Sequence, residues 1–283
     1  MNADQSLPAF NELRLDPKAP VGNAWGLFGA SDKVGMLNLL TPETTREAAK
    51  EIKEGTCISL DWPLSKPSHP SFGRNLFKHR IWDGFSHYGN QKAQCFFINL
   101  TQDQVESTDT MGINAWVENG GIVGRGVLLD YAEWAERNSI SIRPFESFHK
   151  GDILFIRSGF SSEYNKLSTT DQKALAERPS PDFIGLEATM ETLEWIWNSG
   201  FAAVAGDAPS FERSPIAGPH HNPDVMLHQW LLAGWGMPIG ELFDLEKLSD
   251  YCKKTSRRTF FLTSIPLKVL GGVASPPNAV AIF

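Results

Sequence analysis

Apolar runs bounded by glycine, proline or polar residues predict the strands of this chain. Short, nearly continuous apolar runs with turn signals at both ends are typical of strands buried on both faces of a sheet. On this basis we expect strands at residues 56–64, 95–100, 120–130, 151–159, 201–205, 256–266 and 279–283.

Capping signals and apolar residues at helical spacing predict the helices. Thr41 suits an N-cap and Pro42 suits a first helical turn, so we expect a helix from there to about Glu54, ended by Gly55. Apolar side chains recur every three or four residues in the segment 187–198. Two further helices are expected at residues 131–138 and 227–233.

Strands that alternate with helices predict an α/β fold, here a mixed sheet with flanking helices. Some expected strands follow one another closely enough to pair as hairpin neighbours, which is why the sheet is expected to be mixed. Residues 1–40 are punctuated by proline and glycine and predict an irregular N-terminal arm. We expect residues 1–283 to form a single domain.

The composition is that of an ordinary globular protein. The chain has 283 residues, of which 41% are hydrophobic and 21% charged, enough to bury a substantial core. The net charge of −7, without a basic block, argues against nucleic acid as a partner. No signal peptide and no apolar run of about 18 residues is present, so we expect a cytoplasmic protein with no membrane partner.

The three cysteines, Cys57, Cys95 and Cys252, lie far apart in the sequence. Their number and spacing fit neither a disulfide framework nor a zinc motif. We expect thiols in a reducing compartment. Cys95 is the one alternative nucleophile, because it follows shortly after the candidate site.

The candidate chemistry centres on Asp83 and His87, four residues apart in a segment rich in glycine and aromatic residues, and on a distant pair, His228 and Glu241. Residues four apart face the same side of a helix, and in a glycine-containing loop they can still converge. An imidazole gives or takes a proton near neutral pH while a carboxylate orients it. Either carboxylate could orient His87.

Two other polar features are weaker candidates. Asp207 follows an expected strand and is either catalytic or the cap of a turn. The adjacent His220 and His221 resemble a metal pair, but neighbouring residues point apart in helices and strands, so we expect them in a loop.

Segments along nearly the whole chain resemble, in family order, the cyclase family that includes bacterial kynurenine formamidase and isatin hydrolase. The matching segments are 25–38, 82–87, 121–130, 151–154, 205–209, 228–241 and 266–277. The resemblance implies the swivelling β/β/α fold and a homodimer or homotetramer.

The resemblance also implies roles for the candidate residues. In metal-dependent members, the segment His-x-Gly-Thr-His-x-Asp-x-x-x-His supplies metal ligands from its first two histidines and its aspartate, and its last histidine is the acid/base. A later His and Glu complete the site. On this chain the aspartate is Asp83, the acid/base is His87, and the later pair is His228 and Glu241.

The chain departs from this pattern where the first two histidines would stand. Phe77 and Ile81 occupy those positions, and neither side chain can bind a metal. The resemblance therefore points to a divergent sub-group without a two-zinc site. We expect metal-free acid/base chemistry, or a single zinc or manganese ion held by Asp83, His228 and Glu241.

Aromatic residues cluster in sequence around Asp83 and His87, which favours an apolar pocket for a ring-bearing substrate. The residues expected to contact the substrate are Trp25, Asn38, Phe77, Ile81, Trp82, Phe85 and Tyr88.

These features predict an enzyme that acts on a small aromatic or polyketide-like carbonyl compound, in secondary metabolism. It would open or close a ring, isomerise or dehydrate by general acid/base catalysis. Two alternatives are a metal-dependent hydrolase of a cyclic amide, lactone or formamide, and an inactive member that binds a metabolite.

Overall fold

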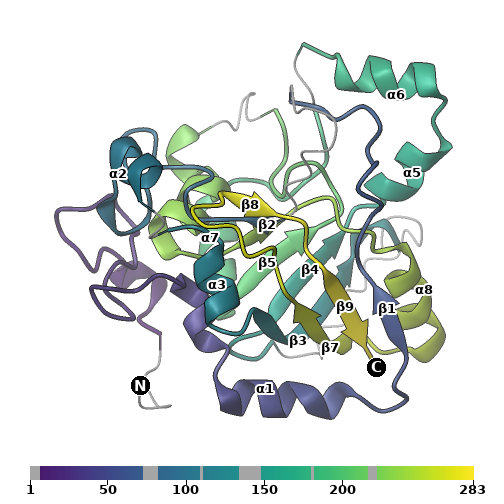
Figure 1. Ribbon diagram of the computed structural model, residues 1–283, viewed down its shortest axis with the longest axis horizontal. Helices are drawn as coiled ribbons and strands as arrows, with labels where there is room; N and C mark the ends of the chain where they lie inside the picture. The colour runs from purple at the N-terminus through teal and green to yellow at the C-terminus, as the bar shows by residue number, and fades with distance from the viewer. Residues whose placement is uncertain (1–6, 73–81, 109–110, 134–147, 180–181, 216–221) are drawn as a thin grey trace.

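The computed structural model describes residues 7–72, 82–108, 111–133, 148–179, 182–215 and 222–283. Within these ranges one mixed sheet of nine strands has the order β1-β9-β7-β3-β4-β5-β6-β2-β8 (Figure 1). The strands are β1 Cys57–Ser59, β2 Trp82–Asp83, β3 Ile122–Asp130, β4 Ile153–Arg157, β5 Ala203–Gly206, β6 Ile239–Gly240, β7 Thr259–Ser264, β8 Ala274–Ser275 and β9 Ala279–Ile282. The predicted α/β class and mixed sheet are thus confirmed.

Parallel strands form the middle of the sheet and antiparallel strands form its two sides. β3, β4, β5 and β6 pair in parallel. On one side β7, β9 and β1 follow in antiparallel pairs, and on the other β2 pairs antiparallel with both β6 and β8. All four residues of β5 are buried, as expected for a central parallel strand covered on both faces.

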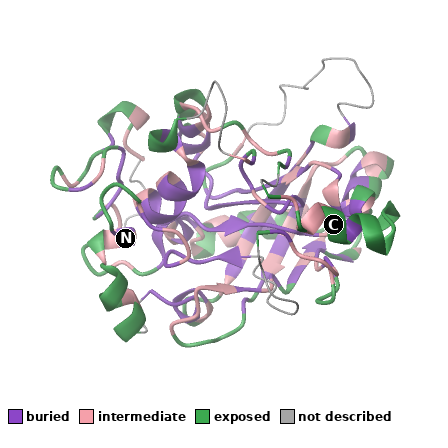
Figure 2. Cartoon of the chain, turned by 90° about the horizontal axis from the view of Figure 1, so that it is seen from above, coloured by how far each residue is buried: buried purple, intermediate pink, exposed green. Residues whose placement is uncertain are grey.

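Helices surround the sheet, with α1 beside β3 and β7 at the bottom of the view and α8 beside the C-terminal strand (Figure 1). The α-helices are α1 Pro42–Ala48, α2 Gln102–Ser107, α3 Asn114–Glu118, α5 Phe160–Lys166, α6 Thr169–Ala176, α7 Met190–Asn198 and α8 Glu246–Thr255. The 3-10 turns are η1 Phe10–Glu12, η2 Gly35–Leu39, η3 Ala49–Glu51, η4 Phe97–Asn99 and η5 Pro223–Val225, and η6 Gln229–Trp235 is a π-helix. Buried residues concentrate on the sheet (Figure 2).

A row of aromatic rings crosses the core and anchors the short strand β2. Trp82 packs edge-on against Phe243, with 5.3 Å between ring centroids, and Phe243 packs in turn against Phe155 at 5.3 Å. Phe155 then contacts Phe260 of β7 at 5.7 Å. Such pairs add roughly 0.5–1.5 kcal/mol each beyond the area that they bury. The residue before Asp83 is therefore fixed in the centre of the molecule.

The helix predicted from Thr41 begins where the sequence indicates. The Thr41 hydroxyl accepts a hydrogen bond from the backbone N–H of Thr44, and the helix starts at Pro42. Its α-helical part ends at Ala48, earlier than expected, and a 3-10 turn continues the chain to Glu51.

The strand predicted at 95–100 is wrong, because residues Phe97–Asn99 form a 3-10 turn. Ile98 and Asn99 have positive φ angles of 51° and 63°, which no strand accommodates. The turn directs Phe97 inward, where it is 2% exposed and its ring centroid lies 5.1 Å from that of Phe85. Burial of this ring outweighs the local strand preference.

Other predicted elements are present with shifted bounds. The strand predicted at 56–64 is only the three residues of β1, and the helix predicted at 227–233 is the π-helix η6. Residues 131–133 are helical, and the rest of the helix predicted at 131–138 lies outside the described residues. Within residues 7–40 the regular structure consists of the turns η1 and η2.

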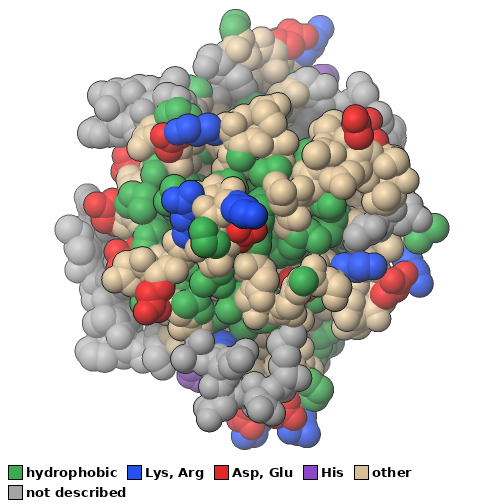
Figure 3. Space-filling view, turned by 90° about the vertical axis from the view of Figure 1, so that its left-hand side faces the viewer, with side chains coloured by type: hydrophobic (Ala, Val, Ile, Leu, Met, Phe, Trp, Pro, Cys, Tyr) green, Lys and Arg blue, Asp and Glu red, His purple; other side chains and the backbone are tan. Residues whose placement is uncertain are grey.

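The surface carries both signs of charge. On the face in Figure 3, acidic and basic side chains are interspersed among hydrophobic ones. Among the described residues, none of the helices has the length and apolar character needed to cross a membrane.

Candidate functional site

Two buried carboxylates reach the same face of the sheet because of strand register. Asp83 pairs with Ile239 across the antiparallel ladder of β2 and β6, and Glu241 follows β6 two positions after Ile239. Side chains two apart on a strand share a face, and a cross-strand partner shares the face of its opposite residue. Asp83 is 0% exposed and Glu241 is 1% exposed.

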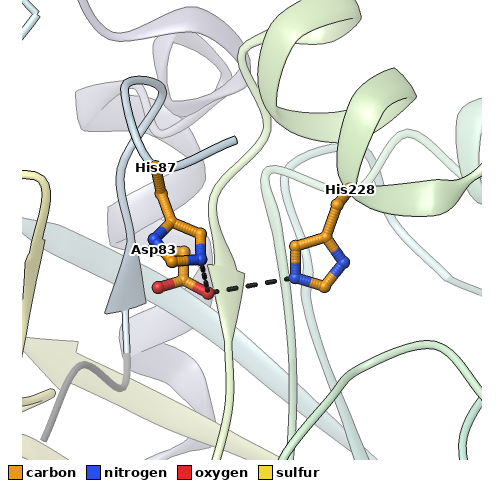
Figure 4. Close-up of side chains that lie close together, drawn as sticks. All are labelled: Asp83, His87 and His228. Carbon is orange, nitrogen blue, oxygen red and sulfur yellow. Dashed lines mark ion pairs between the residues drawn. The ribbon is translucent and has the colours of Figure 1, made fainter. Parts of the chain in front are cut away.

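A tight turn returns His87 to Asp83. The backbone N–H of His87 donates to the carbonyl of Gly84 at 2.8 Å, and Gly84 N–H donates to the Val273 carbonyl at 2.9 Å. A Cβ on Gly84 would lie 2.9 Å from that same Val273 oxygen, so the position requires glycine. The turn places His87 Nε2 3.6 Å from Asp83 Oδ2 (Figure 4).

His228 enters from the other side, immediately before the π-helix η6 (Figure 4). Its Nε2 lies 3.3 Å from Glu241 Oε1 and 4.0 Å from Asp83 Oδ2. Short π-helical segments are rare and often occur at functional sites. The structure therefore brings the pair Asp83 and His87 together with His228 and Glu241, which lie more than 140 residues further along the sequence.

A fifth residue of the site, Glu212, was not predicted from the sequence. Its Oε1 lies 3.0 Å from His228 Nδ1, and its Oε2 accepts the backbone N–H of His228 at 3.2 Å. The available signal was its position five residues after Asp207, on the loop beyond the carboxyl end of β5. Sites in α/β sheets gather at these strand ends.

The carboxylates shape the electrostatics of the buried imidazole. Burial alone lowers the pKa of His228, but the charges and hydrogen bonds of Glu212 and Glu241 outweigh it and raise the pKa well above its ordinary value. Tyr88, whose ring packs edge-on against His228 at 5.9 Å, has its phenol pKa raised by burial and by the Glu212 charge.

The donor set fits one divalent cation. Asp83, His87 and His228 offer ligand atoms that all lie within 4.8 Å of one another. Two imidazoles and a carboxylate suit zinc or manganese. His228 also shows the arrangement usual for a metal-binding histidine, in which the second ring nitrogen is held by a carboxylate. His87 belongs to this set, whereas the sequence reasoning proposed Glu241 as the third ligand.

Five of the residues expected to contact the substrate are described, and most of their side chains make hydrogen bonds or ring contacts within the protein. The Trp25 indole donates to the Ala233 carbonyl at 2.7 Å, and the Trp82 indole donates to the Ser264 hydroxyl at 2.9 Å.

The Asn38 amide donates to Asp32 and to the Gly35 carbonyl, both at 2.8 Å. Phe85 is 1% exposed and packs against Trp116 with 5.3 Å between centroids. Tyr88 is half-buried, and its ring contacts that of His228 in the site. Phe77, Ile81, His220 and His221 lie outside the described residues.

The structure distinguishes the remaining candidates. Asp207 accepts hydrogen bonds from the backbone N–H and hydroxyl of Ser158, both at 2.7 Å, and from Gly159 N–H at 2.8 Å. It thus caps the segment before α5, the structural alternative that the sequence left open. Cys95 is 5% exposed, and burial raises the pKa of its thiol, which disfavours a nucleophilic thiolate.

Among the comparisons with known proteins, the one with solved structures finds similar proteins. No protein-family model matches the chain, and no curated protein matches it. The solved structure of a protein described as a novel cyclase is 25% identical with a TM-score of 0.73, over 92% of this chain and 99% of that one. Isatin hydrolase A from Ralstonia solanacearum is 15% identical with a TM-score of 0.50, over 80% of this chain and 91% of that one.

The first structure is similar over nearly the whole length, and the second shares the fold. These similarities confirm the fold implied by the sequence motifs: the chain has the cyclase-like fold.

Proposed function

We propose that this chain is a cyclase-family enzyme that opens or closes a ring at the carbonyl group of a small aromatic or polyketide-like compound. The convergence of Asp83, His87 and His228, with ligand atoms within 4.8 Å of one another, supports this proposal best. Two imidazoles beside buried carboxylates can act as general acid and base in a reaction at a carbonyl group. The same chemistry would serve an isomerisation or a dehydration.

His87 is the proton-transferring residue in this proposal. Its side chain is 20% exposed, against 10% for His228 and 1% for Asp83, so it is the member of the set that a bound molecule reaches most easily. Asp83 Oδ2, 3.6 Å away, orients the ring and stabilises its protonated form. A positioned acid/base of this kind contributes about 10²–10⁴-fold to rate.

A divalent cation fits the same residues. Asp83, His87 and His228 would hold it, with Glu241 beside the Nε2 of His228. When bound, such an ion polarises a carbonyl oxygen or lowers the pKa of a water molecule. This arrangement supports the second candidate, a metal-dependent hydrolase of a cyclic amide, lactone or formamide.

The deciding experiment measures metal content and turnover together. Purified protein is analysed for zinc and manganese and is assayed on isatin, on an aromatic lactone and on N-formylkynurenine. The assays are repeated after exhaustive chelation and after each ion is restored. Activity that survives chelation supports metal-free acid/base catalysis. Activity that is lost and returns with one ion supports the hydrolase.

Variants test the residue assignments. His87→Gln should lower kcat by about 10²-fold or more, if His87 transfers the proton. His149→Gln, a histidine outside the site, is the control and should retain full activity. Wild-type protein that binds these compounds without converting any of them would instead support the inactive, metabolite-binding alternative.

A further inference from the structure

Glu212 makes a two-point contact with one histidine. One carboxylate oxygen, Oε1, faces the ring Nδ1 of His228 at 3.0 Å. The other, Oε2, accepts the backbone N–H of the same residue at 3.2 Å. The side chain is 1% exposed, so water does not compete for these contacts. Both oxygens are thus used to hold His228.

The backbone around Glu212 is fixed by a second segment of chain. Isolated bridges join Leu186 to Glu212 and Phe183 to Ser214. The Arg213 N–H donates to the Leu186 carbonyl at 2.8 Å, and the Phe183 N–H donates to the Ser214 carbonyl at 2.6 Å. Because the loop is tied on both sides of Glu212, its carboxylate has a defined position toward His228.

The two contacts of Glu212 indicate which ring nitrogen of His228 carries a hydrogen. A backbone amide is always a donor, so Oε2 of Glu212 must accept from it. A carboxylate has only acceptor oxygens, so Oε1 accepts a hydrogen from Nδ1. Nε2 also faces a carboxylate oxygen, Glu241 Oε1, but at 3.3 Å against 3.0 Å between Nδ1 and Glu212. In the neutral ring the single hydrogen is therefore favoured on Nδ1, and the lone pair is on Nε2, 4.0 Å from Asp83 Oδ2.

We propose that Glu212 is a positioning residue that holds the neutral His228 ring with hydrogen on Nδ1 and so offers the Nε2 lone pair to the site. The inference rests on the proposed function only for what uses that lone pair, a divalent cation or a substrate proton. Glu212 itself touches neither. It acts through His228, as a carboxylate behind a metal-binding histidine does.

The variant Glu212→Gln tests this directly, because an amide has one acceptor and one donor end. If the amide oxygen meets the backbone N–H of His228, the NH₂ group must face Nδ1, and the ring must carry its hydrogen on Nε2 instead. If the amide is turned round, two donors face each other at the backbone. The first arrangement costs less, so the variant should reverse the tautomer.

Two measurements follow on full-length protein. Histidine labelled with ¹⁵N gives the ring tautomer of His228 from two-bond ¹H–¹⁵N correlations at alkaline pH, with the signal assigned by its loss in His228→Gln. We expect hydrogen on Nδ1 in wild type and on Nε2 in Glu212→Gln. Calorimetric titration with Zn²⁺ alone should show roughly 10–100-fold weaker binding for Glu212→Gln.

Matched variants separate positioning from packing. Glu133→Gln changes another buried glutamate, 4% exposed and paired with Arg258 at 3.0 Å, and should leave both measurements unchanged. Glu212→Asp keeps two acceptor oxygens and should keep the wild-type tautomer. If Glu212→Gln does not fold, the wild-type and Glu212→Asp spectra decide the question.

Hydrogen on Nε2 in the wild-type ring, or equal Zn²⁺ affinity in wild type and Glu212→Gln, would overturn the inference. Because neither measurement needs a substrate, a reversed tautomer in a protein that converts no compound would sustain the role of Glu212 while refuting the proposed reaction.

Discussion

Gly185 lies so close to the backbone of Glu212 that a Cβ at position 185 would come within 2.4 Å of the Glu212 carbonyl carbon. No side chain fits in this space without displacement of the segment that carries the carboxylate. Glycine at position 185 thus allows the segment that carries Glu212 to pack where it does.

Gly185→Ala should therefore weaken the site as well as the fold. We expect a loss of roughly 1–3 kcal/mol in the free energy of unfolding, as for other overpacked positions. Zn²⁺ affinity should fall as well, because the Glu212 segment must move. Gly234→Ala is the control, since its nearest neighbour, the Gln229 carbonyl, lies at 3.7 Å. Equal Zn²⁺ affinity in the two variants would contradict the prediction.

The metal-free protein should lose stability as the pH rises above neutral. The folded-state pKa of His228 is raised well above the 6.5 of a free imidazole, so its stabilising contribution is full below about 6.5 and disappears as the pH rises through the folded value. Urea unfolding between pH 6 and pH 10 should show a steeper decline for wild type than for His228→Gln. Parallel declines would show that this ring does not titrate as expected.

Ser86→Ala should leave the protein as stable as wild type or make it slightly more stable. The Ser86 hydroxyl is buried, at 7% exposure, and has no hydrogen-bond partner within the described part of the chain. A buried hydroxyl without a partner costs about 1–3 kcal/mol. Ser249→Ala is the contrast, since that hydroxyl donates to Asp130 and its removal should destabilise. Unfolding midpoints in urea give both answers.

Asp207→Asn should destabilise the protein without changing its affinity for Zn²⁺. The carboxylate accepts three hydrogen bonds from Ser158 and Gly159, and an amide offers only one acceptor oxygen. We expect a loss of about 1–3 kcal/mol in the free energy of unfolding. Normal stability with lost activity would instead favour the catalytic alternative for Asp207.

The sequence predicted the parts of this molecule that follow local rules. Long apolar runs such as Ile122–Asp130 were recognised because strands buried on both faces leave a continuous signal. The start at Pro42 was recognised because Thr41 is a capping residue. The pair Asp83 and His87 was found because four-residue spacing and family motifs both pointed to it.

The parts that depend on distant partners could not be predicted this way. β2 has two residues and exists because β6 and β8 lie on either side of it, so no periodicity marks it. Ile98 adopts a positive φ because burial of the neighbouring Phe97 requires a turn. Nothing in the local sequence distinguishes Glu212 from other acidic residues, because its partner His228 lies 16 residues further along the chain.

The position of Asp83 also has a consequence for biosynthesis. Its strand is completed by Ala274, near the end of the chain, and the turn after it is held by the Val273 carbonyl. A nascent chain that has not yet released these residues from the ribosome already contains Asp83 and His87 but lacks the strand that aligns Asp83. Asp83 should therefore be aligned only after the residues up to Ser275 have been synthesised and released, and a stop codon at position 273 should be as damaging as a change at Asp83 itself.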